Sequence, residues 1–244
     1  MGKSLITFLA AVLAWVLGSL TPALALDTRT FVPKGAEVYA PVLVEKQREV
    51  WPRAPEPYTL GGLVEQESCI SLTHSKCWNP RAELKTAREY GFGFGQVTIA
   101  YRADGSERMN VFNELRRQHD SLRDWTWANR YDPGYQLTAI VEMTLVIWRR
   151  LAADPGATVT DQWAFTLSSY NGGVGGLLQD RRLCSNTSGC DPSRWFGNVE
   201  LTSLKSKVPQ PGYAGQSWFE INRKHVRNVL TLRRDKYKAF WGLR

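Results

Sequence analysis

The chain has 244 residues, of which 43% are hydrophobic and 22% are charged. Ten Trp, nine Tyr and nine Phe are more apolar surface than a disordered chain leaves in water, and a single long apolar stretch excludes a protein with many membrane spans. The formal charge of +8, from 31 Lys and Arg against 23 Asp and Glu, favours polyanionic partners such as nucleic acid, anionic lipid or acidic cell-wall polymers.

The first 25 residues have the pattern of a secretory signal peptide. Lys3 supplies a positive start, Leu5 to Leu20 carries no charge, and Ala23-Leu24-Ala25 offers the small residues of a cleavage site. We expect cleavage after Ala25, with an uncleaved membrane anchor as the alternative. Export to the periplasm or cell envelope removes nucleic acid from the expected partners. A membrane remains an expected partner only if the segment is not cleaved.

Residues 26–56 are predicted to form a Pro-rich arm. Five of the twelve prolines fall between Pro33 and Pro57, so at most one short helix is expected there, within residues 42–51. Beyond Pro57 the apolar residues follow helical spacing. This change predicts one domain over residues 57–240, without internal repeats.

The first helical segment of that domain has a carboxylate, Glu67, on its apolar face. Thr59 is placed to cap this helix, whose other side is expected to turn Glu65 and Gln66 toward solvent. A carboxyl group on a buried face has a raised pKa, as a general acid needs near neutral pH. The alternative is that the carboxylate pairs with one of the 31 basic residues. The face has i, i+3, i+4, i+7 spacing and consists of Leu60, Leu63, Val64 and Glu67.

Three further segments are predicted helices, over residues 137–151, from near Thr160 to Gly172, and over residues 218–232. The best strand signal covers residues 96–101 and precedes a turn at Asp104-Gly105. The fold class is therefore mostly α, with a small or vestigial β-hairpin.

The chain has four cysteines, which is an even number in a predicted exported protein and indicates disulfides. Three pairings exist, and the sequence alone does not choose among them. Cys69–Cys77 and Cys184–Cys190 are preferred because each pair brackets a short polar loop. The three histidines are scattered and the cysteines lack C-x2-C spacing, so neither a metal site nor another cofactor is expected.

Two polar motifs follow the first helix. The alternating glycines of Gly91-Phe-Gly-Phe-Gly-Gln96 would let a ligand lie against the backbone, and Gln96 offers a donor and an acceptor. The spacing is not that of a phosphate-binding loop. Ser168-Ser-Tyr-Asn-Gly-Gly173 places polar side chains at a helix end. Taken singly, the first motif is more often an ordinary Gly-rich turn than a binding site. The second motif is also what an ordinary helix C-terminus looks like.

Taken in series, the motifs resemble those of the soluble lytic transglycosylases. Leu63-Val-Glu-Gln-Glu67-Ser68 resembles that family's catalytic Glu-Ser motif, Gly93-Phe-Gly-Gln96 its Gly-Leu-Met-Gln, and Ser169-Tyr-Asn-Gly-Gly173 its Ala-Tyr-Asn-Ala-Gly. Two further segments, Tyr131-Asp-Pro133 and Glu220-Ile-Asn-Arg-Lys-His-Val226, are similar to the family's Asp-Pro helix entry and its Glu-Thr-Arg-x-Tyr-Val segment. The resemblance spans Pro57 to Leu232, with longer connections than usual between Glu67 and Gln96 and over residues 102–130.

The resemblance implies a lysozyme-like α domain that cleaves the β-1,4 bond between N-acetylmuramic acid and N-acetylglucosamine in peptidoglycan strands. Glu67 would act as acid and then as base, while the substrate's own 2-acetamido group stabilises the anomeric centre. The muramic 6-hydroxyl would then close a 1,6-anhydro ring. Ser68, Gln96, Tyr170 and Asn171 would orient Glu67 or bind sugar.

Three other functions compete with this one. A hydrolytic muramidase would need a second carboxylate, for which Asp104, Asp124, Asp132 and Asp161 are available outside any motif. A non-catalytic wall-binding assembly subunit would not need a Glu at position 67. A membrane-surface protein could use the basic residues 223–238, although these also fit the solvated face of a packed helix. The oligomeric state is left open.

Overall fold

The computed structural model describes residues 26–151, 156–210 and 214–244. The predicted signal peptide and its cleavage site lie outside the described residues. Within this part of the chain, no helix is both long and apolar enough to cross a bilayer. Helices predominate, and one small sheet accompanies them, so the prediction of a mostly α chain is confirmed.

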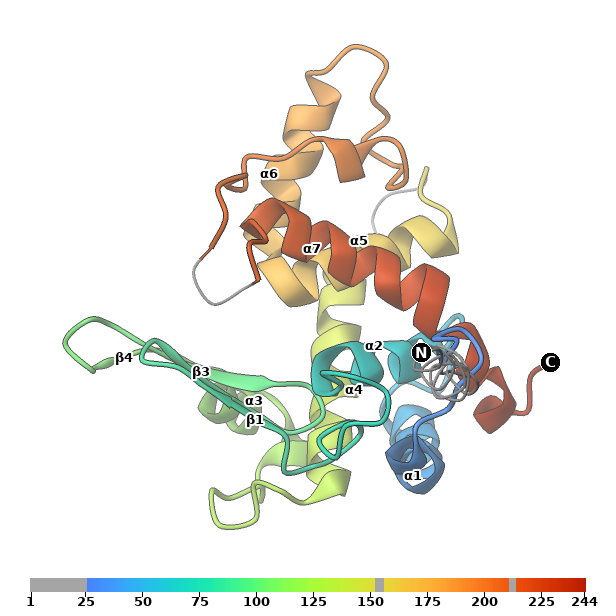
Figure 1. Ribbon diagram of the computed structural model, residues 1–244, viewed down its shortest axis with the longest axis vertical. Helices are drawn as coiled ribbons and strands as arrows, with labels where there is room; N and C mark the ends of the chain where they lie inside the picture. The colour runs from blue at the N-terminus through green and yellow to red at the C-terminus, as the bar shows by residue number, and fades with distance from the viewer. Residues whose placement is uncertain (1–25, 152–155, 211–213) are drawn as a thin grey trace, which may run out of the picture.

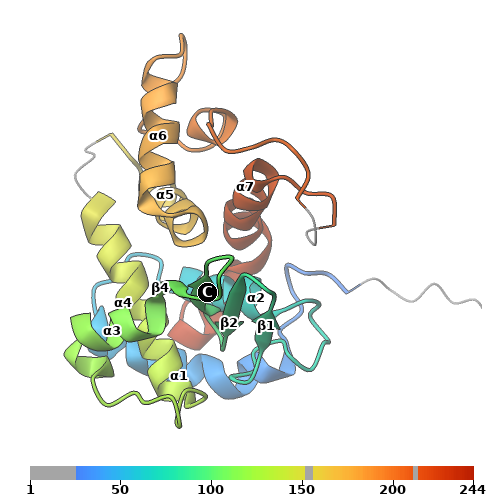
Figure 2. The same ribbon diagram turned by 90° about the vertical axis from the view of Figure 1, so that its left-hand side faces the viewer.

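The helices form two groups joined by the long helix α4 (Figures 1 and 2). Helices α5, α6 and α7 lie at one end of the molecule, while α1, α2 and the sheet lie at the other. The helices are α1 Lys34–Val50, α2 Thr59–Ser68, α3 Val111–Gln118, α4 Pro133–Leu151, α5 Val159–Gly172, α6 Val174–Ser185 and α7 Trp218–Asn228. Shorter helical turns are η1 Asp120–Leu122, η2 Val199–Leu201, the π-helical η3 Val229–Arg233 and η4 Asp235–Trp241.

The predicted helices at 137–151 and 160–172 are confirmed as α4 and α5, whereas other helix ends differ from prediction. The last helix ends at Asn228, where the backbone widens into a π-helical turn, instead of continuing to Leu232. Thr59 is the first residue of α2 and does not cap it, because the N-cap position belongs to Tyr58.

The sheet is larger than the predicted hairpin. It is a four-stranded antiparallel sheet in the order β1-β2-β3-β4, and the strand predicted at 96–101 is its third. The outer strands escaped prediction because they are short, mostly exposed, and lack alternating apolar residues. The strands are β1 Glu83–Lys85, β2 Glu89–Phe92, β3 Val97–Tyr101 and β4 Glu107–Asn110.

The two faces of the sheet have different neighbours. On one face Phe92 and Val97 form a cross-strand pair that packs against Phe112 and Trp125 in a small second core. On the other face Leu84, Gly91 and Thr98 are register partners, and all three line a cleft beside the end of α2. Because successive side chains on a strand alternate between faces, this register decides which residues of β1 and β2 reach the cleft.

Helix α1 replaces most of the predicted Pro-rich arm. It has 17 residues rather than a short segment within 42–51, and Pro41 lies inside it. Its fully buried Ala36, Ala40 and Leu43 belong to the main core, where α1 packs against α4. The small residues on this face gave a weak apolar pattern, so the helix was not recognised beyond its last two turns.

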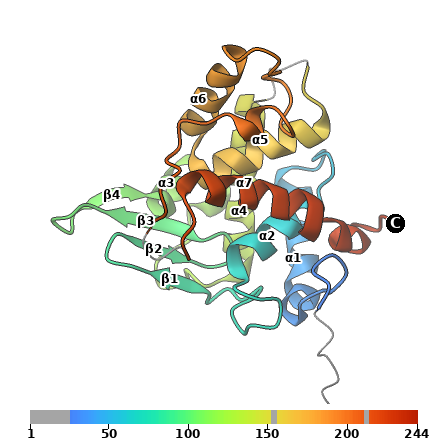
Figure 3. The same cartoon turned by 45° about the horizontal axis from the view of Figure 1, so that its top comes forward.

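The segment after α7 packs on α2 through η3 and η4, and Figure 3 shows α7 leading into it. This approach needs Gly61, because a Cβ at that position would lie 2.6 Å from the ring of Tyr237. Tyr237 is fully buried, and its hydroxyl accepts a hydrogen bond from the indole N–H of Trp78 at 2.9 Å.

Glu65 is completely buried, so the prediction that it faces solvent was wrong. Its two carboxylate oxygens lie 2.7 Å from Arg233 Nη1 and 2.7 Å from Lys236 Nζ, and one of them accepts a hydrogen bond from the Tyr237 hydroxyl. The helical pattern of α2 alone could not reveal these partners, which come from a segment about 170 residues later. A fully paired buried carboxylate links α2 to the C-terminus.

Both disulfide pairings predicted from loop length are confirmed. Cys69–Cys77 follows the end of α2, and Cys184–Cys190 follows the end of α6. Each closes a loop of fewer than ten residues, with sequence separations of 8 and 6.

The Glu65 cluster predicts a large loss of stability in Glu65→Gln, because the change leaves Arg233 and the buried Lys236 without their counter-charge. Removal of one partner from a buried ion pair typically costs about 3–5 kcal/mol. Thermal and urea unfolding of the variant should show this loss. Glu49→Gln, which breaks an exposed pair with Lys46, is the matched control and should change stability by less than about 1 kcal/mol. Equal stabilities of the two variants would contradict the role of Glu65 as a buried, charge-paired carboxylate that stabilises the fold.

Candidate active site

A cleft of about 360 Å³ lies between the end of α2, the sheet and the end of α5. We call the face of the sheet that lines it, with Leu84, Gly91 and Thr98, the inner face. Glu67 and Ser68 come from α2, Gln96 from the turn between β2 and β3, and Asn171 from α5. The structure therefore brings four of the five predicted site residues to one cleft. The fifth, Tyr170, lies behind this surface.

Glu67 is the acid of the cleft. Its side chain keeps 16% of its surface exposed, and burial raises the pKa of its carboxyl group to about 8. Among the described residues, no lysine or arginine forms an ion pair with it, which removes the alternative of a structural salt bridge. Glu67 thus holds its proton at neutral pH and keeps a side of the carboxyl group open to the cleft.

His225 of α7 is the neighbour of Glu67 that the sequence did not single out. Its Nδ1 lies 3.3 Å from Glu67 Oε1, and its side chain is only 4% exposed. Burial, and secondly the positive charge of Arg233, lower the pKa of His225 to about 3, so the imidazole is neutral at ordinary pH. His225 lies within the Glu220–Val226 segment, and its helical spacing with Ile221 and Val229 indicated that it would face the interior.

Tyr170 supports the turn that carries Gln96. Its hydroxyl donates a hydrogen bond of 3.0 Å to the carbonyl of Gly95, and a Cβ at position 95 would lie 2.7 Å from that hydroxyl. Burial, and secondly the nearby Glu67 carboxylate, raise the pKa of Tyr170 well above its ordinary value. Tyr170 therefore stays a neutral hydrogen-bond donor beside Glu67.

Gln96 has a positive φ of 47° and donates from Nε2 to the Gly93 carbonyl at 3.0 Å, so its own turn fixes its side chain. Asn171 is exposed, and its Oδ1 accepts a hydrogen bond from Asn222 Nδ2 at 3.1 Å. Both amides line the cleft with part of their hydrogen-bonding capacity still free for a ligand.

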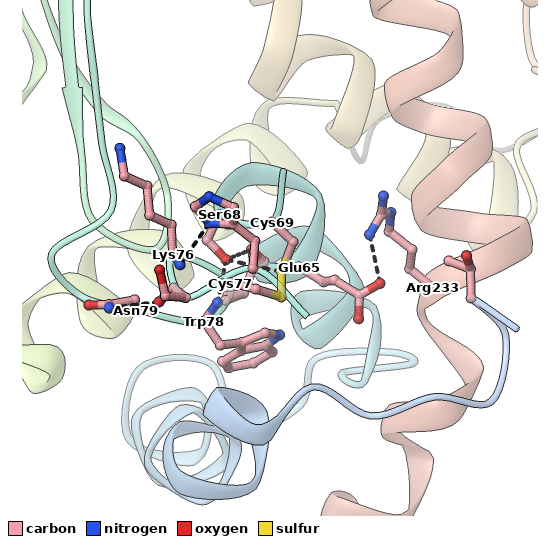
Figure 4. The surroundings of a disulfide bond; sticks show 12 residues. Glu65, Ser68, Cys69, Lys76, Cys77, Trp78, Asn79 and Arg233 are labelled. Atoms are coloured by element: carbon pink, nitrogen blue, oxygen red, sulfur yellow. Dashed lines mark hydrogen bonds and ion pairs between the residues drawn. A yellow bond between two sulfur atoms is a disulfide. The ribbon is translucent and has the colours of Figure 1, made fainter. Parts of the chain in front are cut away.

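Ser68 joins α2 to the Cys69–Cys77 loop (Figure 4). Its hydroxyl donates to the Val64 carbonyl at 2.7 Å and accepts the backbone N–H of Trp78 at 3.1 Å. The disulfide and this hydroxyl together hold the residues that directly follow Glu67. Figure 4 also shows Glu65 reaching toward Arg233, on a different side of α2 from the disulfide.

The cleft continues into a second hollow of about 430 Å³ at the end of α5. The two hollows share Glu89 and Asn171, and the second is also lined by Trp218 and Asn222. Trp218 is 39% exposed, so part of an aromatic side chain faces the surface at this end. The two hollows therefore adjoin at the end of α5.

The carboxylates in the cleft differ from those considered in the sequence. Asp104, Asp124, Asp132 and Asp161 do not line it, and Asp161 instead forms the capping box of α5. Two glutamates of the sheet do line it, Glu83 and Glu89.

Glu83 and Glu89 lie on opposite faces of the sheet. The Glu83 carboxylate accepts hydrogen bonds from Tyr131 and Tyr90, which lower its pKa and hold it toward the face of the sheet that carries Phe92. Glu89 precedes Gly91 by two positions on β2 and so shares the inner face. Glu89 is therefore the second carboxylate of the cleft, and it was missed because β2 was not predicted.

No metal ligand set is found among the described residues: no group of three or more His, Cys, Asp and Glu side chains is close enough to hold an ion.

The chain was also compared with known proteins. No model of a protein family matches it, and no curated protein matches its sequence.

The raised pKa of Glu67 predicts that the Glu67→Gln variant gains stability relative to the wild type as the pH rises. The native state binds the Glu67 proton more tightly than the unfolded chain does, so the stability of the wild type falls from about pH 4.5 upward and levels off above pH 8. The complete shift corresponds to roughly 5 kcal/mol. Gln does not ionise, so the difference in melting temperature should grow between pH 5 and pH 9.

Glu220→Gln is the control, because its stability relative to the wild type should change with pH in the opposite direction. Hydrogen bonds from Ser217 lower the pKa of the exposed Glu220 carboxyl, so its contribution is present at high pH and is lost under acid. A melting-temperature difference for Glu67→Gln that does not change with pH would show that Glu67 ionises normally.

Proposed function

We propose that the chain is a peptidoglycan lytic transglycosylase in which Glu67 is the catalytic acid and base. The observation that carries the proposal is a protonated carboxyl group in a groove, with no lysine or arginine of the described residues paired to it and with amide side chains around it. A general acid must hold its proton until the leaving oxygen takes it, and a carboxyl group with a pKa near 8 does so at neutral pH.

The proposed reaction consumes no water. Glu67 gives its proton to the glycosidic oxygen as the C1–O bond breaks, and the acetamido oxygen of the muramic residue bonds to C1 to form an oxazolinium ion. The ionised Glu67 then removes the proton of the 6-hydroxyl. O6 displaces the acetamido oxygen at C1, which gives the 1,6-anhydro ring and restores the protonated Glu67.

Several features of the groove suit this substrate. The groove extends past Asn171 toward Trp218, which gives space for more than one sugar on that side of Glu67. Gln96 and Asn171 offer the amide donors and acceptors that sugar hydroxyl and acetamido groups require. The net charge of +8 favours acidic wall polymers.

The disulfides fit folding in an oxidising compartment, such as the periplasm or another part of the cell envelope. Peptidoglycan lies in the same place, so the proposed compartment and the proposed substrate agree.

A hydrolytic muramidase is the second candidate, and Glu89 is the observation that favours it. In an inverting hydrolase a second carboxylate activates water on the face of the sugar opposite the acid. Glu89 reaches the same cleft from the sheet, across from α2. The two mechanisms predict different products, since hydrolysis adds one water per cleaved bond and leaves a reducing muramic end.

The decisive prediction concerns the products and two variants of similar size. Digestion of sacculi by the wild type should give 1,6-anhydro-muramic ends, detected by mass spectrometry as lighter by one water than reducing ends. Glu67→Gln keeps the shape of the side chain but cannot deliver a proton, so activity should fall by at least about 10²–10⁴-fold. Glu89→Gln should lower activity by less than about tenfold and leave the anhydro ends unchanged.

Each other outcome has a defined meaning. Reducing ends, together with a large loss in Glu89→Gln, would establish the muramidase. Binding to sacculi without cleavage by the wild type would establish a wall-binding subunit. Full activity of Glu67→Gln would show that Glu67 is not the acid.

The pH dependence of cleavage should have a basic limb near pH 8. The value of kcat/KM on solubilised glycan strands should fall about tenfold per pH unit above that point, because Glu67 must be protonated when the substrate binds. His225, with a pKa near 3, and Tyr170, whose pKa burial raises well above its ordinary value, do not titrate in this range. A basic limb near pH 5 would contradict the environment assigned to Glu67.

A further inference from the structure

The contact between α7 and α2 behind the cleft contains a histidine with one nitrogen in use. Nδ1 of His225 lies 3.3 Å from Glu67 Oε1, at the long end of hydrogen-bonding distance, as is common for catalytic groups in a ligand-free site. Nε2 of the same ring is buried and has no hydrogen-bond partner among the described residues. This asymmetry determines where the ring carries its single proton.

A neutral imidazole has one N–H donor and one acceptor nitrogen. If the hydrogen were on Nε2, a donor would be buried without an acceptor, which is energetically unfavourable. If the hydrogen is on Nδ1, it faces a carboxyl oxygen, and only a lone pair is left without a partner. Orphaned acceptors are tolerated better than orphaned N–H groups in protein interiors.

We propose that His225 is a positioning residue for Glu67, with its Nδ1–H donating to Oε1 so that the transferable proton of Glu67 is on Oε2. The opposite arrangement, in which Oε1–H donates to Nδ1, would force the ring hydrogen onto the unpartnered Nε2. When Glu67 ionises in the second half of the reaction, the same Nδ1–H holds the carboxylate in place. The hydrogen bond does not depend on the proposed function, whereas its consequence for turnover does.

The other two histidines of the chain provide internal references. His74 accepts the backbone N–H of Lys76 on Nδ1 at 3.0 Å, so a neutral His74 carries its hydrogen on Nε2. Nδ1 of His119 lies 3.0 Å from Glu142 Oε2, in a His–Glu pair outside the cleft. The chain thus contains a ring of the opposite tautomer and a second His–Glu pair for comparison.

The first experiment measures the tautomer without substrate. A long-range ¹H–¹⁵N spectrum of the uniformly labelled protein at pH 7 distinguishes a protonated ring nitrogen from an unprotonated one, and His225→Asn identifies which signals belong to His225. We expect a protonated Nδ1 and an unprotonated Nε2 for His225, with the reverse for His74. A protonated Nε2 in His225 would overturn the proposal, whatever reaction the protein catalyses.

The second experiment uses two amides and one apolar residue at position 225. The amide nitrogen of Asn comes close to the place of Nδ1, whereas that of Gln reaches the place of Nε2. We therefore expect His225→Leu and His225→Gln to lower kcat on the order of 10²-fold, the cost of misplacing a catalytic group by about 1 Å. KM should change little, and His225→Asn should recover most of the loss.

A readout on Glu67 itself separates positioning from a general packing defect. Loss of the Nδ1–H donor removes an interaction that favours the ionised carboxylate, so the Glu67 pKa, followed by its carboxyl ¹³C shift, should rise in His225→Leu but not in His225→Asn. His119→Gln removes the second His–Glu pair and should alter neither kcat nor the Glu67 titration. Equal activity and equal titration of the Asn and Gln variants would overturn the proposal. If no variant or wild type cleaves glycan, the proposed function fails, while the tautomer and the titration still decide this inference.

Discussion

The rest of the site depends on the different environments of two carboxylates on one helix. Glu65 and Glu67 lie two residues apart on α2, and both are withdrawn from bulk solvent. Glu65 receives Arg233, Lys236 and Tyr237, so its charge is balanced inside the protein. Within the described part of the chain Glu67 has no lysine or arginine partner and lies beside a neutral imidazole, and burial keeps its carboxyl group protonated. One residue stabilises the fold, while the other is left available for chemistry.

The C-terminal segment produces this difference. It packs closely on α2 because Gly61 leaves room for Tyr237, and the same segment supplies both cations of Glu65. Helix α7, just before it, places His225 behind Glu67. The final quarter of the chain thus supplies partners of both carboxylates, although neither lies in that part of the sequence.

The opposite wall of the cleft comes from three separate parts of the chain. The disulfide loop after Ser68, the inner face of β2 and β3, and the end of α5 each contribute one or two polar groups. Tyr170 connects two of them by its hydrogen bond to Gly95. The cleft thus combines a carboxyl group on a helix with polar side chains on turns.

The sequence by itself determined the features that depend on local order. The spacing of apolar residues indicated α4 and α5, loop length favoured the disulfide partners, and the face shared by Leu60, Leu63 and Val64 indicated that Glu67 was not an ordinary surface residue. It also brought Gln96 and Asn171 forward as candidates before their positions were known. Each of these features is set by residues within about one or two helical turns of one another.

Only the tertiary structure decided which charges meet. The burial of Glu65, the orphaned nitrogen of His225 and the place of Glu89 on the inner face depend on contacts between distant segments and on the register of two strands. Helix α1 belongs to the same class, since its small apolar residues become a core face only against α4. Periodicity shows which side of an element is apolar, but burial and pKa depend on the groups that cover that side. For Glu65 and Glu67 those groups come from the other end of the chain.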